Sequence, residues 1–220
     1  MPKHVTLSAV VSGHEEPLRE KRRRELRQQL SDVATRLFLE HGFDAVKVAD
    51  VAKACGVTVK TVYNHFPSKE SLLADRWEIQ TGALRQLLLD PATGPVDAAL
   101  EVLEAEVRYM TSAATSANGA PGLAELRRFG KLIQSTPSLM AHNRESLDRL
   151  TSIVALTIAQ RTGTAADEPE PWITATAIAG LWPVYFRSLR KHLALGSVAR
   201  VTAAVQDDLR RAAATLRKGV

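Results

Sequence analysis

The sequence has 220 residues, 45% of them hydrophobic, 24% charged and 5% aromatic, and its single cysteine excludes an intrachain disulfide and a cysteine-based metal site. The longest uncharged run, residues 172–186, falls short of the roughly 20 apolar residues of a membrane span, and the first residues lack the apolar core of a signal peptide, so we expect a cytoplasmic protein. The net charge is +5, and residues 1–69 hold 12 lysines and arginines against 8 acidic residues, which predicts an anionic partner, nucleic acid or a membrane surface, for this first third.

Abundant alanine and leucine, short β-branched runs and apolar residues at helical spacing predict an all-α protein of about nine helices. Residues 1–17 are polar, without a sustained period, and are expected to form a flexible tail. Helices are predicted over residues 19–41, 48–55, 58–66, 68–89, 96–115, 123–134, 138–162, 172–195 and 197–217. Pro183 is expected to kink the eighth of them, because a proline inside a helix removes a backbone hydrogen bond.

The two short helices at residues 48–55 and 58–66 are joined by a turn that contains Gly56, which is the helix-turn-helix pattern. Thr58 is a natural N-cap for the second of these helices. A small apolar core is expected where the helices cross, formed by Val51, Ala52, Val57, Val62 and Phe66. The opposite face of the second helix then carries Val59, Lys60, Tyr63 and Asn64, with Thr61 and His65 at its flanks.

This exposed face has the chemistry that reads a DNA major groove, which admits one α-helix. Lys60 can donate to guanine, Asn64 can pair with adenine, and Val59 or Tyr63 can pack on a thymine methyl group. Phosphate contacts are expected from Thr58, Thr61, Tyr63, His65 and Lys69. Lys69 lies in the first turn of the helix predicted from residue 68 and opposes its dipole, so we expect a phosphate partner rather than local stability to explain it. The alternative, an ordinary solvated face, is disfavoured by the exposed valine and tyrosine.

The block LFLEHGFDAVKVADVAKACGVTVKTVYNHFPSKESLL resembles the DNA-binding domain of TetR-family transcriptional regulators. The shared features are Gly42-Phe43, Val51-Ala52, Gly56-Val57-Thr58, Thr61 to Phe66, Lys69-Glu70 and Leu72. The resemblance implies a helix-turn-helix domain over residues 18–67 and a ligand-binding and dimerisation domain over residues 68–220. Two positions depart from the family pattern. Lys47 and Val48 replace the usual threonine, which loses or moves the helix cap and leaves Lys47 to reach a phosphate, and Lys60 replaces a small residue.

The resemblance also implies that the last two helices pack against their copies as a four-helix bundle. Their apolar stripes are Ile178, Leu181, Tyr185 and Leu189 in one helix and Val201, Val205, Leu209 and Ala213 in the other, and these residues could equally form the core of one chain. Large or flexible side chains are candidates for an inducer pocket, or else plain core: Trp77, Val107, Met110, Phe129, Ile133, Met140, Leu147, Trp182 and Tyr185.

A basic group lies around the break at residues 135–138 and comprises Arg127, Arg128, Lys131 and Arg144. It is either a solvated face or a site for the anionic head group of an acyl-CoA-like inducer. The stretch from residue 127 to residue 163 resembles the C-terminal domain of actinobacterial TetR-like regulators, including those of mycofactocin clusters, and this resemblance implies the second interpretation because some of those regulators sense acyl-CoA.

These patterns together predict a homodimeric repressor that binds a pseudo-palindromic double-stranded DNA operator, with half-sites about one helical turn apart, and that a small molecule releases. We expect no enzyme activity, no metal and no cofactor. The alternative, a helical enzyme or ligand carrier, has little support because the six histidines are scattered and no catalytic set or phosphate loop is present.

Two smaller alternatives stay open in the first third. The basic segment at residues 19–27 is a solvated helix start or an arm that contacts DNA, and it lacks the apolar face of a membrane helix. Cys55 is a small core residue or a redox sensor.

Overall fold

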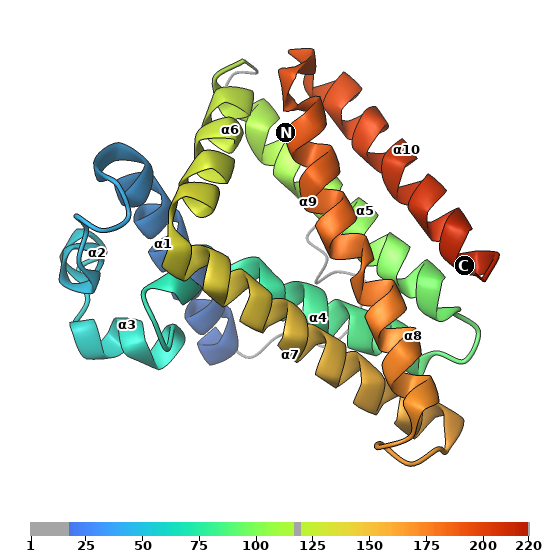
Figure 1. The fold of residues 1–220 in the computed structure, drawn as a ribbon. Coiled ribbons are helices and arrows are strands. Elements are labelled where there is room, and N and C mark those ends of the chain that lie inside the picture. Colours follow the sequence, from blue (N-terminus) through green and yellow to red (C-terminus); the bar gives the residue numbers. More distant parts are fainter. Residues whose placement is uncertain (1–17, 117–119, 220) are drawn as a thin grey trace. The chain divides into compact units, whose positions relative to one another are not determined.

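The computed structural model describes residues 18–116 and 120–219, so the tail expected over residues 1–17 lies outside the described residues. The described residues are helical throughout apart from turns and short connections, and they contain no strand, which confirms the all-α class (Figure 1). None of these helices is long and apolar enough to cross a membrane.

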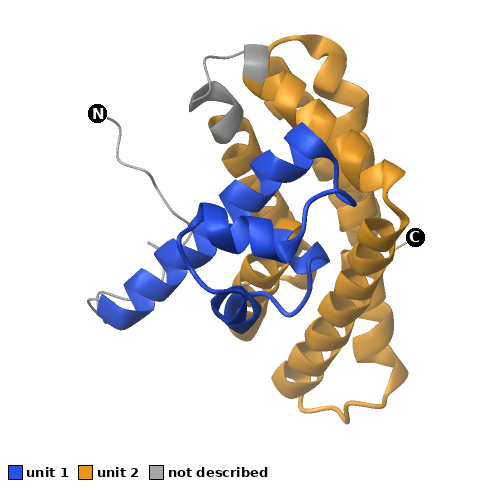
Figure 2. Cartoon of the chain, turned by 90° about the vertical axis from the view of Figure 1, so that its left-hand side faces the viewer, with its two compact units in different colours: residues 1–72 blue, residues 73–220 orange. Residues whose placement is uncertain are grey.

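The chain divides into two compact units, residues 1–72 and residues 73–220, drawn in blue and orange in Figure 2. The division lies after Leu72. The segment after Pro67 does not begin the next long helix. Ser68 and Ser71 instead exchange hydrogen bonds, each backbone N–H donating to the other hydroxyl, at 3.1 and 3.2 Å. A single 3₁₀ turn follows (Glu70–Leu73), and the Ser31 hydroxyl donates to the Leu72 carbonyl at 2.9 Å.

Unit 1 contains α1 (Leu18–His41), α2 (Val48–Ala54) and α3 (Val59–His65). Residues Leu30, Ala34 and Phe38 recur every four positions on α1 and are fully or almost fully buried. The Phe38 ring lies 4.9 Å from that of Phe43, centroid to centroid. Gly42 ends α1 with a φ of 87°, a conformation that side chains other than glycine rarely adopt. The buried stripe of α1 thus faces the core of unit 1, in which α2 packs against α1 and α3 packs against α2.

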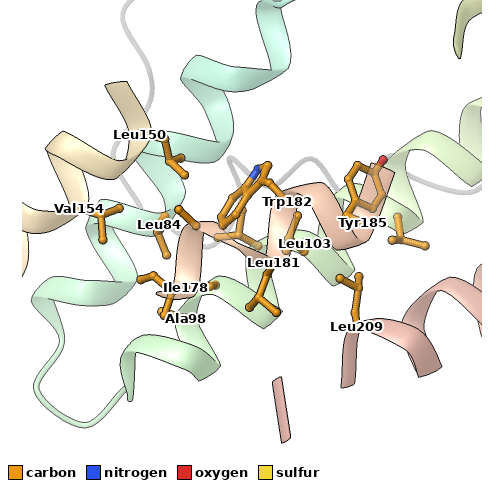
Figure 3. Close-up of a cluster of buried hydrophobic side chains, with 14 of the residues drawn as sticks. Leu84, Ala98, Leu103, Leu150, Val154, Ile178, Leu181, Trp182, Tyr185 and Leu209 are labelled. Atoms are coloured by element: carbon orange, nitrogen blue, oxygen red, sulfur yellow. The ribbon is translucent and has the colours of Figure 1, made fainter. Parts of the chain in front are cut away.

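Unit 2 contains the longer helices, α4 (Asp75–Leu89), α5 (Pro95–Ser116), α6 (Ala120–Ser135), α7 (Pro137–Thr162), α8 (Pro169–Ala179), α9 (Leu181–His192) and α10 (Val198–Arg217), with a 3₁₀ turn at Leu193–Leu195. Helix α5 packs against α4, α6 and α10, and α7 packs against α4 and α8 (Figure 1). Their apolar faces meet in one core, in which Leu84, Leu103, Leu150, Ile178 and Trp182 are 0–1% exposed (Figure 3).

The helix predicted over residues 172–195 is two helices, α8 and α9, and the break lies at Gly180 rather than at Pro183. The reason is the proline itself. Its ring would clash with the carbonyl of Ala179, four residues earlier, if the helix were continuous. Ending α8 at Ala179 places Pro183 in the first turn of α9, where a missing N–H costs nothing.

Candidate nucleic-acid interface

Helix α3 is held in place by a short, well-bonded turn after α2. Gly56 adopts a φ of 67°, and the N–H of Val57 donates to the Ala52 carbonyl at 3.0 Å, which closes the end of α2. Thr58 then caps α3, because its hydroxyl oxygen accepts a hydrogen bond from the Thr61 N–H at 3.1 Å. The predicted N-cap is confirmed.

The two faces of α3 differ in exposure as the sequence predicts. Val62 and the following Phe66 are each 1% exposed, whereas Val59 is 39% exposed and Tyr63 is 51% exposed. The structure also exposes Thr58, Lys60 and Asn64, and it half-buries Thr61 and His65. The hydroxyls of Thr58 and Thr61 lie 2.9 Å apart and share a hydrogen bond. An apolar valine and a tyrosine therefore lie beside a lysine and an amide on an exposed surface, which is the arrangement that base edges and methyl groups of DNA complement.

Lys47 precedes α2 without capping it through its side chain. The Asp50 carboxylate accepts from the Lys47 backbone N–H at 2.7 Å, and the Asp50 N–H donates to the Lys47 carbonyl at 2.9 Å. This is half of a capping box, so the cap has moved to an acidic residue three positions later. Sequence reasoning missed Asp50, although an acidic residue in the first turn of a helix is the usual sign. The exposed Lys47 ammonium takes no part in the cap.

Lys69 has a partner within unit 1, so a phosphate is not needed to account for a lysine at this position. Its ammonium lies 4.3 Å from the centroid of the Phe43 ring and 5.6 Å from that of Phe38. A cation over an aromatic face stabilises the fold by about 0.5–1 kcal/mol at a partly exposed site. The lysine thus helps to hold the end of unit 1 against α1.

Arg27 ties α1 to the end of α3. Its guanidinium donates to the His65 carbonyl and lies 4.4 Å over the Phe66 ring. The carbonyl at the last residue of a helix has no partner within the helix, so this bond satisfies a group that otherwise needs water. Within the basic segment of residues 19–27, Arg27 therefore has a structural role inside unit 1.

His65 is half-buried, and its buried Nδ1 has no hydrogen-bond partner among the described residues. Burial, and then the positive charges of Arg23 and Arg27, lower the pKa of His65 below its ordinary value, so the ring is neutral at neutral pH. Beside it lies a hollow of about 360 Å³ that Arg19, Glu20, Arg23, Asn64 and His65 line. The ring therefore offers a hydrogen bond rather than a charge.

Cys55 is half-buried, with its sulfur 4.0 Å from the Gln29 carbonyl oxygen. Burial raises the pKa of this thiol and Arg36 lowers it by less, so the thiol is protonated at neutral pH. A protonated, half-buried thiol favours the core interpretation over the redox sensor.

The structure divides the nine predicted pocket residues into two groups. Val107, Trp182 and Tyr185 are buried in the core of unit 2, and Trp77, Met110 and Leu147 pack against that core. Phe129, Ile133 and Met140 are half-buried on α6 and α7, apart from this cluster. The indole N–H of Trp182 donates to the side-chain oxygen of Gln80 at 2.7 Å inside the core. Sequence reasoning missed Gln80, because a lone glutamine on a helix carries no pattern.

The apolar stripes of the last two helices belong to the core of one chain. Ile178, Leu181, Tyr185, Val201, Val205, Leu209 and Ala213 are all 0–2% exposed. Leu189, the remaining member, is half-buried and packs against that core. The other face of α9 and α10 carries a hollow of about 310 Å³, lined by Val184, Arg187, Ser188, Lys191, Asp208, Arg211, Ala212 and Thr215. The basic group on α6 and α7, Arg127, Arg128, Lys131 and Arg144, is exposed.

Comparison with known proteins gives two family matches. The sequence model of bacterial regulatory proteins of the tetR family matches residues 30–75, and that of the MftR C-terminal domain matches residues 100–220, more than half of the chain. The chain belongs to the TetR family. The match of residues 100–220 agrees with the resemblance to mycofactocin-associated regulators in the sequence. This TetR-family chain is thus a DNA-binding transcriptional regulator with an N-terminal helix-turn-helix.

Named relatives align with one or both parts. The HTH-type transcriptional regulator AcrR of Shigella flexneri is 38% identical over 66 residues, which are 30% of this chain and only 31% of that protein. A protein of Mycobacterium tuberculosis named as the mycofactocin biosynthesis transcriptional regulator MftR is 25% identical over 161 residues, 73% of this chain and 78% of that one. A solved complex of SmeT with triclosan shares the fold, with a TM-score of 0.51, 17% identity and coverage of 84% and 90% of the two chains.

Proposed function

We propose that this TetR-family regulator is a homodimeric repressor whose two α3 helices read the half-sites of a pseudo-palindromic operator. The observation that carries the proposal is the exposed face of α3, where Val59, Lys60, Tyr63 and Asn64 stand free of the core while Val62 anchors the helix. Lys47 and the Thr58 hydroxyl flank that face and supply phosphate contacts that fix its register. We place its action in the cytoplasm, where bacterial operator DNA lies.

The second copy binds through the outer face of α9 and α10. This face combines apolar Val184 and Ala212 with charged Arg187, Lys191 and Asp208 around its hollow. Paired reading heads need a fixed separation of about one helical turn of DNA, which a rigid bundle of these helices from two copies supplies.

A small molecule that binds unit 2 lowers operator affinity by changing the separation of the two reading heads. The coupling is reciprocal, so operator DNA weakens binding of the ligand by the same factor. An acyl-CoA-like ligand, with its phosphates on the exposed Arg127, Arg128, Lys131 and Arg144, is the version of this proposal that the resemblance to mycofactocin-associated regulators supports.

Gel shifts of the full chain on sites selected from random DNA test the proposal. We expect binding at about 10⁻⁸ M or tighter at physiological salt. Lys60→Ala and Tyr63→Ala each weaken specific binding by about tenfold or more without changing the melting temperature. Arg85→Ala, which removes an exposed cation from α4, is the matched control and leaves binding unchanged. Equal affinity for every DNA sequence refutes the proposal.

A further inference from the structure

The first turn of α4 is anchored differently from the rest of that helix. Near its end, α4 packs fully buried leucines such as Leu88 into the apolar core. In the first turn, Arg76 binds Glu106 of α5, and the Trp77 indole N–H donates to the side-chain oxygen of Asn143 on α7 at 3.3 Å. A ligand can replace a hydrogen bond or an ion pair with an equivalent bond of its own, whereas it cannot replace the packing of buried apolar side chains in this way. The ion pair of Arg76 is therefore the anchor of this turn that a ligand can replace, whereas Trp77 also packs against the apolar core.

Arg76 and Glu106 form a two-point ion pair in a mostly buried position. The Arg76 Nε lies 3.3 and 3.0 Å from the two Glu106 oxygens, and Nη2 donates to Oε2 as well. The guanidinium carbon lies 3.7 Å from the centroid of the Tyr109 ring. Burial lowers the pKa of Arg76, but the hydrogen bonds and charge of Glu106 together outweigh it and raise that pKa.

Three further aromatic rings, which begin with Trp77 next to Arg76 in the sequence, contact one another in unit 2. The Trp77 ring lies 5.9 Å from Phe186, and Phe186 lies 5.1 Å from Tyr185, centroid to centroid. Burial and the charge of Glu106 hold the pKa of Tyr185 (Figure 3) well above its ordinary value, so its phenol stays neutral. A buried carboxylate beside aromatic faces is the chemistry that binds an organic cation, and the Arg76 guanidinium now fills that place.

The two side chains of the ion pair differ in how easily a ligand can displace them. The Arg76 side chain is 23% exposed and long enough to turn into solvent, whereas the Glu106 side chain is 4% exposed. An anionic ligand would have to displace Glu106, which cannot reach water, or lie beside its negative charge. A cationic ligand needs only to replace Arg76. The geometry therefore favours a cation that water hydrates weakly and that carries N–H donors for Glu106, as a guanidinium does.

We propose that Glu106 and the Tyr109 ring form a binding site for a weakly hydrated organic cation, which acts by replacing the Arg76 guanidinium. The inference rests on the proposed function, in which a small molecule that binds unit 2 lowers operator affinity, and it assigns an organic cation to that role in place of the acyl-CoA-like ligand. Replacement frees the first turn of α4 from α5, and the freed turn lowers the affinity of the regulator for its operator.

Isothermal titration of the full chain with hexylguanidinium tests the site, and hexanol and hexanoate are the neutral and anionic controls. We expect the wild type to bind hexylguanidinium and to bind neither hexanol nor hexanoate. Glu106→Gln weakens that binding by about tenfold or more, and Arg76→Met strengthens it by about tenfold, because the internal competitor is gone. Arg85→Met, which removes an exposed arginine from the same helix, is the matched control and leaves the binding unchanged.

A merely structural ion pair predicts less stable variants and no bound cation. Absence of binding to the wild type, or equal binding to Glu106→Gln, overturns the proposal. If Glu106→Gln does not fold, as its melting curve will show, the comparison of Arg76→Met with the wild type decides. Tighter binding supports the site, and unchanged or weaker binding overturns it.

Operator affinity measured on the same samples separates this inference from the proposed function. A hexylguanidinium concentration that just saturates the wild type should lower its operator affinity by about tenfold and should lower that of Glu106→Gln by clearly less. If a long-chain acyl-CoA releases the operator and the cation does not, the inference is wrong and the proposed function stands. If no DNA is bound at all, the proposed function fails, while the titration still decides whether the cation site exists.

Discussion

Replacing Arg27 with methionine tests whether this arginine supports α3 or contacts DNA. Methionine keeps the apolar stem but removes the charged hydrogen bond to the His65 carbonyl and the cation over the Phe66 ring. A charged hydrogen bond contributes about 1.5 kcal/mol at the low end of its range, and a partly exposed cation–π contact contributes about 0.5–1 kcal/mol. The free energy of unfolding of unit 1 should therefore fall by about 2 kcal/mol, which lowers its melting temperature by roughly 10 °C.

Thermal unfolding and operator binding at several salt concentrations give the two readouts. A structural Arg27 lowers the melting temperature and leaves the salt dependence of operator binding unchanged. An arginine that contacts a phosphate instead reduces the slope of log affinity against log salt by about one, with unchanged stability. That second result would refute the structural role. Arg22→Met, at an exposed position on α1, is the control for loss of a nearby charge and should leave the melting temperature unchanged.

Three further predictions follow from particular contacts. Val62→Ala removes buried methyl groups from under α3, so it should lower the free energy of unfolding of unit 1 by about 2 kcal/mol in urea unfolding and also weaken operator binding. Val59→Ala, at an exposed position, should lower that free energy by less. Asp50→Ala removes the cap of α2 and should cost about 1 kcal/mol by the same measurement, while Asp50→Asn retains most of it. Hydrogen bonds from Ser188 and then His192 lower the pKa of Asp208 from 3.8 to about 2, so its contribution to stability is complete above pH 3.8 and is lost as the pH falls towards 2. Unfolding followed by circular dichroism across that range should show a shallower loss for Asp208→Asn.

The features that the sequence predicted are those with a local cause. The sidedness of α3 follows from Val62 and Phe66 at a spacing of four, and its start follows from the Thr58 hydroxyl, so both could be read along the chain. The cation–π contact of Lys69 with Phe43 joins residues far apart in the sequence, so no local pattern announced it. The same holds for the bond from Arg27 to the His65 carbonyl.

The C-terminal unit was less predictable for a different reason. A stripe such as Val201 and Val205 looks the same whether it faces its own chain or a second copy, and only the fold shows that it is core. Arg76 and Glu106 lie 30 positions apart on two helices, and each alone resembles a solvated charge. The sequence predicted a kink at Pro183, whereas the helix breaks at Gly180. The proline was recognised, but its clash with the preceding turn was not.

Selection of binding sites from random duplex DNA by the full chain tests most directly whether the exposed face of α3 reads a specific DNA sequence. We expect enrichment of one pseudo-palindrome with half-sites about one helical turn apart, and loss of that enrichment in a Lys60→Ala and Tyr63→Ala double variant that folds normally. Enrichment of the same sequence by the double variant, or of no sequence by the wild type, would contradict this expectation.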